Sequence, residues 1–495
     1  MTDQAQIDAL RDVPLTPRNL LIDGAFVPSA SGQTDDVISP LNGTVLTTTA
    51  AATAEDTVSA IAAARTAFED KRWRGMPPQM RKKIMLRWAD LMEAEMLELA
   101  VLGVRNNGTE IGMALKAEPG SAIATLRYYA EAIDKVYGEI APTADDVMGL
   151  IHREAIGVVA AIIPWNFPLM IGAWKLGPAL AAGNSVVLKP SETASLSLIR
   201  MAELAMEAGV PPGVLNVVTG SGAVVGAALS NSMDVDVITF TGSGTTGRKL
   251  LQASAASNMK RCYLELGGKS ANVVFADAEN LSQAAAVSAA GIFRNSGQVC
   301  VAGSRLLVEQ RIHDAFVEEL AKAAAAMKVG DPLDLTTQAG AVNNATQLEQ
   351  NLEFVETAQA EGGALHQGGK RILEDTGGYF MEPTIITGVA PDHSVVQKEV
   401  FGPVLAVTPF ADEDEAIRLA NDTDYGLAGG VWTSNLSRAH RMVREMRTGV
   451  VHVNTYGGPD VTVPMGGVKQ SGNGHDKSLH ALDKFVDLKT AWIKL

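Results

Sequence analysis

Short apolar runs alternate along most of the chain with longer segments whose apolar residues recur every three or four positions. Four such runs follow one another in the middle of the chain: GVVAAIIP (157–164), SVVLKP (185–190), VLNVVTG (214–220) and VDVITFTG (235–242). Largely apolar runs without strict alternation are typical of parallel strands that are covered on both faces. Each run leads through a turn into a helical pattern. The chain is therefore predicted to have an α/β fold with a β-α-β-α series of the dinucleotide-binding kind.

A second α/β series follows the segment YLELGG (263–268). It opens with the predicted strand ANVVFAD and continues to about His452. Gly267 and Gly268 permit the chain to reverse direction, because glycine adopts backbone conformations that other residues avoid. We therefore place a domain boundary at these two glycines.

Local signals near the start of the chain predict a hairpin and two helices. The Asp-Gly pair in LLIDGAFV (20–27) lies between apolar residues, as in a tight hairpin. The segment 53–70 has the pattern of an amphipathic helix, with Thr53 and Asp56 placed as a capping pair. A second long helical pattern covers Gln79–Leu102.

The composition limits the classes of partner. The chain has 495 residues, 41 basic against 56 acidic, and a net charge of −15, so a nucleic-acid backbone would be repelled. Two cysteines, Cys262 and Cys300, are too few for a disulfide framework or a zinc site of the CxxC type, and we expect no metal.

The sequence also argues against secretion and membrane insertion. The N-terminus lacks the basic start and apolar core of a signal peptide. Segment Gly157–Trp174 is long enough to span a bilayer, but it contains Pro164, Asn166 and Pro168. We interpret it as a buried strand that ends in a loop, and we expect a cytoplasmic protein.

Two segments carry candidate reactive groups. FRNSGQVC (293–300) places Cys300 after a predicted helix among small and polar residues, where a thiolate could act as a nucleophile. The alternative is a buried structural cysteine, which is how we interpret Cys262. In YLELGG, Glu265 lies between Leu264 and Leu266, so an apolar wall could raise its pKa and make it a general base. An exposed strand glutamate is the alternative.

Three turns at strand ends could bind a cofactor. GSGTTG (242–247) matches the phosphate-binding template of dinucleotide-binding folds. That template also expects a ribose-binding acid about 20 positions further on, which gives Glu265 a second possible role beside that of general base. In LKPSE (188–192), Lys189 and Glu192 could bind ribose hydroxyls or form a solvated cap. In PWNFP (164–168), the Asn166 carboxamide could donate to an oxyanion or satisfy its own loop.

Six segments in this order resemble the aldehyde dehydrogenase superfamily: PWNFP, LKPSE, FTGS, LELGG, FRNSGQVC and KEVFGPV, which span Pro164 to Val404. The resemblance implies that Cys300 is the nucleophile, that Asn166 and the Cys300 N–H form the oxyanion hole, and that Glu265 is the general base. Lys189 belongs to this catalytic set as well as to the cofactor site. The residues implied to bind the cofactor are Trp165, Lys189, Ser191, Glu192, Gly222, Gly226, Ser243, Glu399 and Phe401.

The same resemblance implies the substrate and the cofactor. Two segments, 128–143 and 469–490, are similar to enzymes that oxidise γ-glutamyl-γ-aminobutyraldehyde, 4-guanidinobutyraldehyde and related ω-aminoaldehydes. The substrate tunnel is expected to be lined by Phe167, Trp174, Tyr456, Asp460 and Met465, where Met465 replaces the usual phenylalanine. NAD is favoured over NADP, because Glu192 would repel a 2′-phosphate.

The family fold implies three parts. They are a Rossmann-like NAD-binding domain (1–132 and 155–266), a catalytic domain (267–475) and an oligomerisation arm (133–154 and 476–495). The apolar C-terminal segment would be an exposed edge in a monomer, so we expect a homodimer or homotetramer. Two alternatives stay open: a CoA-acylating semialdehyde dehydrogenase, against which Glu265 argues, and a non-catalytic family member with a structural or binding role.

Overall fold

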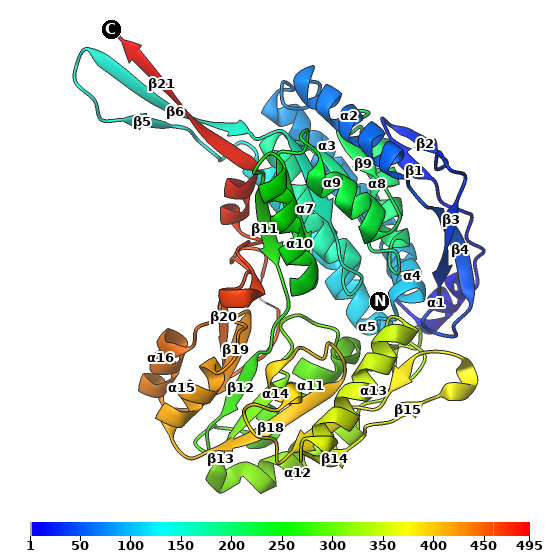
Figure 1. The fold of residues 1–495 in the computed structure, drawn as a ribbon, viewed down its shortest axis with the longest axis vertical. Helices are drawn as coiled ribbons and strands as arrows, with labels where there is room; N and C mark the ends of the chain where they lie inside the picture. Colours follow the sequence, from blue (N-terminus) through cyan, green and yellow to red (C-terminus); the bar gives the residue numbers. More distant parts are fainter. Residues whose placement is uncertain (1, 459) are drawn as a thin grey trace.

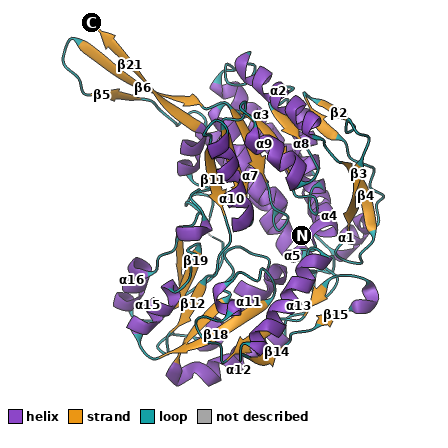
Figure 2. Ribbon diagram, viewed as in Figure 1, coloured by secondary structure: helices purple, strands orange, loops and turns teal. Residues whose placement is uncertain are grey.

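The computed structural model describes residues 2–458 and 460–495, which form two lobes and a projecting arm (Figure 1). Helices pack around the strands in both lobes, as Figure 2 shows, and this confirms the predicted α/β class. No helix in the described part of the chain is long and apolar enough to cross a membrane.

The first lobe contains a sheet whose described strands lie in the order β11-β10-β7-β8-β9-β1-β2. Its strands are β1 (Leu20–Ile22), β2 (Ala25–Val27), β7 (Val158–Ile162), β8 (Ser185–Lys189), β9 (Leu215–Val217), β10 (Val237–Thr241) and β11 (Arg261–Glu265). The strands from β7 to β11 are parallel, and the predicted hairpin β1–β2 adds antiparallel strands at one edge. The buried runs predicted in the sequence therefore form the centre of this sheet.

The strand order places a crevice at the carboxyl ends of β7 and β10. The chain goes from β7 outward to β8 on one side, whereas β10 and β11 lie on the other side of β7. Ligands bind in open α/β sheets at such a reversal of strand order. The loops that follow these two strands are PWNFP and GSGTTG, so both candidate motifs lie at the reversal.

Helices cover this sheet on both faces. They are α2 (Ala54–Glu69), α3 (Pro78–Ala94), α4 (Met96–Asn107), α6 (Ser121–Ala132), α7 (Pro168–Ala182), α8 (Leu196–Ala208), α9 (Ala227–Asn231) and α10 (Gly244–Ala256). The predicted capping box is present, because Thr53 and Asp56 each accept the other's backbone N–H. The single helix predicted over Gln79–Leu102 is wrong. It breaks at Glu95, whose carboxylate pairs with Arg200 at 2.5 Å.

The second lobe contains a sheet whose described strands lie in the order β14-β17-β18-β13-β12-β19-β20. Its strands are β12 (Ala271–Val274), β13 (Arg305–Glu309), β14 (Ala364–Gln367), β17 (Thr384–Thr387), β18 (Val404–Phe410), β19 (Ala428–Trp432) and β20 (Val450–Val453). Its principal helices are α11 (Leu281–Phe293), α12 (His313–Ala325), α13 (Ala345–Ala360), α15 (Glu413–Asn421) and α16 (Leu436–Glu445). The chain crosses from β11 in the first sheet to β12 in the second through residues 266–270.

The arm is a separate antiparallel sheet of β5 (Glu139–Ala141), β6 (Val147–Ala155) and β21 (Val486–Lys494), which projects from the body in Figure 1. Of the segment 476–495 that was predicted to belong to the arm, residues 486–494 form its strand β21. The preceding turn, Leu479–Phe485, packs against α7 in the first lobe. The division of the chain into three domains stays a prediction.

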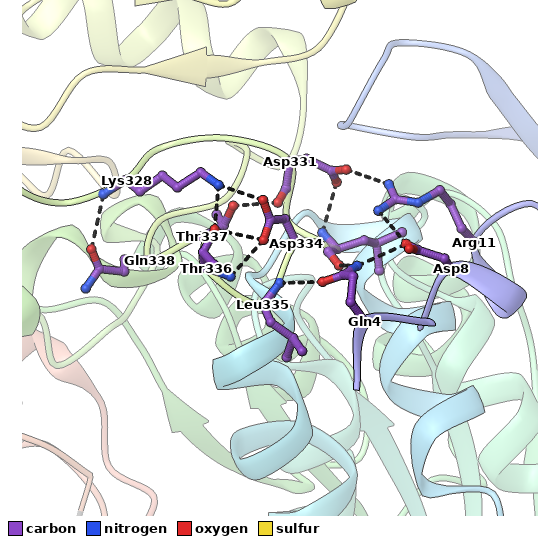
Figure 3. Close-up of polar contacts among 11 residues, drawn as sticks. Gln4, Asp8, Arg11, Lys328, Asp331, Asp334, Leu335, Thr336, Thr337 and Gln338 are labelled. Atoms are coloured by element: carbon purple, nitrogen blue, oxygen red, sulfur yellow. Dashed lines mark hydrogen bonds and ion pairs between the residues drawn. The ribbon is translucent and has the colours of Figure 1, made fainter. Parts of the chain in front are cut away.

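The N-terminal helix α1 (Gln4–Arg11) is held against a loop of the second lobe (Figure 3). The side chain of Gln4 donates to the Leu333 carbonyl at 2.9 Å and accepts from the Leu335 N–H at 3.0 Å. Arg11 pairs with Asp331 at 2.5 Å. The polar start of the chain therefore helps to join the lobes.

Candidate active site

A cavity of about 250 Å³ lies at the strand-order reversal and receives side chains from both lobes. The first lobe contributes residues after β7 and β10, and the second contributes residues around α13 and KEVFGP. Its lining includes Trp165, Asn166, Gly242, Ser243, Gly267, Cys300, Gln347, Phe354, Glu399 and Phe401. The structure therefore brings together five of the six motifs, and LKPSE lies on the neighbouring strand β8.

Lys189 and Glu192 form a pair at the end of β8. Their charged atoms lie 3.4 Å apart, and Glu192 also accepts the Gly222 N–H at 2.8 Å. Burial lowers the pKa of Lys189, and Glu192 opposes the shift. The Ser191 and Thr193 hydroxyls lie 3.3 Å apart in the same turn. The predicted ribose-binding group is thus assembled beside the glycine-rich turn that follows β9.

The glycine turns leave backbone open to a ligand. A Cβ atom added at Gly222 or Gly226 would meet no atom within 4 Å. Ser243 is the N-cap of α10, and its hydroxyl accepts the Thr246 N–H. The free N–H groups at the start of this 13-residue helix favour an anion. This open backbone next to a helix N-terminus fits a dinucleotide.

The loop before Cys300 has an uncommon backbone. Asn295, Ser296 and Gly297 all have positive φ, at 51°, 49° and 72°. Buried hydrogen bonds hold it: the Ser296 hydroxyl donates to the Gly340 carbonyl at 2.7 Å, and Gln298 accepts the Asn343 N–H at 2.8 Å. Strained backbone persists where its surroundings fix it, and such places are often functional.

Cys300 is the thiol that this loop presents to the cavity. Burial, together with the nearby carboxylates of Glu399 and Glu265, raises the pKa of Cys300 to about 12. The side chain of Asn166 is 4% exposed, and one of its two N–H groups donates to the Gln298 carbonyl at 2.9 Å. The other N–H can donate to a group bound in the cavity. Cys262, in contrast, is buried inside β11 and does not line this cavity.

Glu265 ends β11 and is 6% exposed. Its neighbours Leu264 and Leu266 are buried as well, so the alternative of an exposed glutamate is wrong. One carboxylate oxygen of Glu265 has no hydrogen-bond partner among the described residues. Burial and the neighbouring Asp476 raise the pKa of Glu265 well above its usual value.

Sequence reasoning missed a buried charge cluster beside Glu265. Asp476 binds Lys175 and Lys484, each at 2.5 Å, and all three side chains are buried. Burial alone would raise the pKa of Asp476, but the two lysines outweigh it and lower that pKa. Both lysines also favour the charged form of Glu265. No local motif marks this cluster, because its members come from segments far apart in the chain.

Glu399 and Phe401 lie where the two lobes meet. Glu399 accepts the Gly268 N–H at 2.8 Å and packs over Gly267, where a Cβ would approach its carboxylate to 2.0 Å. Burial raises the pKa of Glu399 to about 7. The rings of Phe401 and Trp165 make an edge contact with centroids 5.2 Å apart.

A second cavity, of about 690 Å³, is also lined by Cys300. Four of the five predicted substrate residues line it, namely Phe167, Trp174, Asp460 and Met465. Tyr456 is not among the lining residues of this cavity, and its substrate role stays a prediction. Its ring fills the space left by Gly303 and Gly430, and its hydroxyl donates to the Val301 carbonyl at 2.8 Å.

Comparisons with known proteins agree with this architecture. Residues 26–491 match the model of the aldehyde dehydrogenase family. The chain is 49% identical to the NADP/NAD-dependent aldehyde dehydrogenase PuuC of Escherichia coli over 476 residues, which cover 96% of this chain and 95% of the relative. It is similar over the full length of both chains to two solved structures, each at 48% identity. One is an indole-3-acetaldehyde dehydrogenase mutant, AldA of P. syringae, in complex with NAD+ and IAA (TM-score 0.98). The other is a γ-glutamyl-γ-aminobutyraldehyde dehydrogenase of Burkholderia cenocepacia (TM-score 0.97).

Proposed function

This chain belongs to the aldehyde dehydrogenase family and oxidises an aldehyde to a carboxylic acid with NAD, and on this premise we propose that Cys300 is its nucleophile. One observation carries the proposal. Among the described residues, Cys300 is the one that lines both the cavity at the strand-order reversal and the second cavity. A covalent nucleophile must reach the substrate from one side while the hydride acceptor lies on the other.

We assign the first cavity and the adjoining turns to NAD. Lys189, Ser191 and Glu192 would hold the adenosine ribose, with Gly222 and Gly226 letting the backbone approach. Ser243 at the start of α10 would bind the pyrophosphate, and Glu399 and Phe401 would hold the nicotinamide ribose beside Trp165. When bound there, NAD supplies the hydride acceptor for the reaction. The Glu192 carboxylate would repel a 2′-phosphate, so NAD is preferred to NADP.

The chain's own residues account for the remaining chemistry. The Cys300 thiol loses its proton to solvent as the sulfur bonds to the aldehyde carbon, and the negative charge that develops on oxygen is stabilised by the free Asn166 N–H and the Cys300 backbone N–H. Loss of hydride from that carbon leaves a thioester on Cys300. Glu265 then removes a proton from water, the hydroxide attacks the thioester carbon, and the C–S bond breaks to release the acid.

The second cavity, which Phe167, Trp174 and Met465 help to line, supports an extended or aromatic aldehyde, including an ω-aminoaldehyde whose amine is acylated. The solved relatives are named for aldehydes of this size. We assign residues 1–132 and 155–266 to the NAD-binding domain, 267–475 to the catalytic domain, and the projecting sheet to oligomerisation. Ile140, Leu488 and Trp492 are exposed on that sheet, and a second copy that covered them would remove this apolar surface from water. We therefore propose a homodimer or homotetramer, and a cytoplasmic location.

NADH formation with Cys300→Ala and Cys262→Ala tests the assignment. Both variants lose one thiol, but Cys262 lies inside a strand and serves as the matched control. We expect Cys300→Ala to lose activity with every aldehyde and Cys262→Ala to keep it. Full activity in Cys300→Ala would show that another group is the nucleophile. Repeating the assay with NADP tests the cofactor preference.

A further inference from the structure

The wall of the second cavity carries a buried cation, Lys477, that the mechanism does not use. Lys477 is 4% exposed and lines the cavity together with Cys300. Its ammonium nitrogen lies 5.1 Å from the centre of the Trp174 ring. Both Asp460 and Cys300 interact electrostatically with it, so its charge is felt at the reacting sulfur and at the acidic residue on the cavity wall.

The backbone is built to direct Lys477 into the cavity. Lys477 and Ser478 both have positive φ, at 63° and 51°, a conformation that costs about 1 kcal/mol or more for residues other than glycine. Two hydrogen bonds fix the turn: the Ser478 N–H donates to the Val461 carbonyl at 2.7 Å, and the Tyr129 hydroxyl donates to the Ser478 carbonyl at 2.9 Å. Adjacent side chains therefore part, with Asp476 in the buried cluster and Lys477 in the cavity wall.

The other charged groups on this cavity leave its wall basic. Lys116 and Arg294 are exposed lining residues, and both are cations. Of the two lining carboxylates, Glu110 is buried, accepts the Asn295 N–H, and has its pKa raised by burial to about 7. Asp460 is exposed and accepts the Thr462 N–H at 2.9 Å. A substrate that ends in an ammonium group would face Lys477, whereas a carboxylate would gain a charged donor.

We propose that Lys477 determines specificity by binding a carboxylate on the tail of the aldehyde substrate. The preferred substrates are then extended aldehydes with an acidic group, rather than aldehydes whose tail carries a positive charge alone. A γ-glutamyl tail contains such a carboxylate. This inference rests on the proposed function, because it needs the aldehyde carbon at Cys300.

Three aldehydes of similar length separate the possibilities: pentanal, glutarate semialdehyde and trimethylammoniobutanal, which are neutral, anionic and cationic. The kcat/KM of each is measured with NAD for the wild type, Lys477→Met and Lys477→Arg. Lys83→Met, on the exposed face of α3, is the matched control. In Lys477→Met we expect kcat/KM for glutarate semialdehyde to fall about 10- to 100-fold, as for loss of one hydrogen bond to a charged group. Pentanal should change little, and Lys477→Arg should retain most of the preference.

The outcomes are distinguishable from failure of the proposed function. Wild type that oxidises none of the three would overturn the assignment of the reaction. Wild type that oxidises pentanal, but whose preference for glutarate semialdehyde survives in Lys477→Met, would overturn the role of Lys477. So would an equal loss for all three aldehydes, because that indicates a structural role beside Trp174.

A pH series adds an independent readout. Burial lowers the pKa of Lys477 to about 8, and Asp460 and Asp476 oppose the shift, as does Cys300. Lys477 is therefore charged below about pH 8 and neutral above it. The ratio of kcat/KM for glutarate semialdehyde to that for pentanal should fall as pH rises through this value in the wild type. A ratio that falls equally in Lys477→Met would assign the effect to another titrating group, such as Glu110, whose pKa burial raises to about 7, and would contradict the proposal.

Discussion

The buried cluster beside Glu265 makes a sharp prediction for Asp476→Asn. The substitution keeps the shape of the side chain but leaves Lys175 and Lys484 without the carboxylate that each binds at 2.5 Å. Breaking a buried charge pair by removing one partner costs about 3–5 kcal/mol, because the remaining charges stay desolvated. Unfolding entropy for 495 residues is about 1 kcal/mol per degree. We therefore expect Tm to fall by about 3–5 °C for cooperative unfolding.

The pH dependence of this loss has a defined sign. The pKa of Asp476 is lowered in the folded protein, so its contribution to stability is present above the unfolded value of about 3.9 and declines as pH falls below it. Thermal unfolding is followed at pH 7 and at acidic pH, with the exposed turn residue Asp392→Asn as control. A Tm for Asp476→Asn at pH 7 that matches the control would refute the reasoning, because the cluster would then contribute no net stability.

Four further results follow from the geometry. Glu265→Gln should keep the rapid first turnover of NADH formation but slow steady-state turnover about 10²- to 10⁴-fold, because only thioester hydrolysis loses its base. Stopped-flow measurements would show both phases, and loss of the rapid first turnover would contradict this prediction. Gly222→Val should raise KM for NAD with little change in Tm, since the added side chain enters open space in the cofactor turn. Tyr456→Phe should lower stability by about 1 kcal/mol and leave KM for aldehydes unchanged, because it loses one buried hydrogen bond outside the substrate cavity. Trp492→Glu on the exposed arm should shift the mass measured by light scattering towards the monomer, and an unchanged mass would argue against assembly through β21.

The parts of the fold that the sequence predicted are those that local chemistry decides. Strands β7, β8 and β10 are continuous apolar runs bounded by turns, and helix α2 has its own capping box, so each could be located without tertiary information. The break at Glu95 could not be located in this way. It has no glycine or proline signal, and its carboxylate is held by Arg200, which is distant in sequence.

The site residues show the same difference between those that a local motif reveals and those that only tertiary packing brings together. The motif residues are recognisable because each lies in a short segment, whereas Lys175, Asp476 and Lys484 become a group only after α7 and the C-terminal turn have packed together. The same packing explains Lys477: the positive φ values at 477 and 478 separate adjacent side chains into two environments, one beside Glu265 and one beside the substrate. A single turn would thus bias the hydrolytic base through Asp476 and select the substrate through Lys477. Lys477→Met should therefore alter the choice of aldehyde without shifting the acid limb of the pH profile for thioester hydrolysis. Asp476→Asn should shift that limb to lower pH, because the substitution removes the carboxylate that raises the pKa of Glu265.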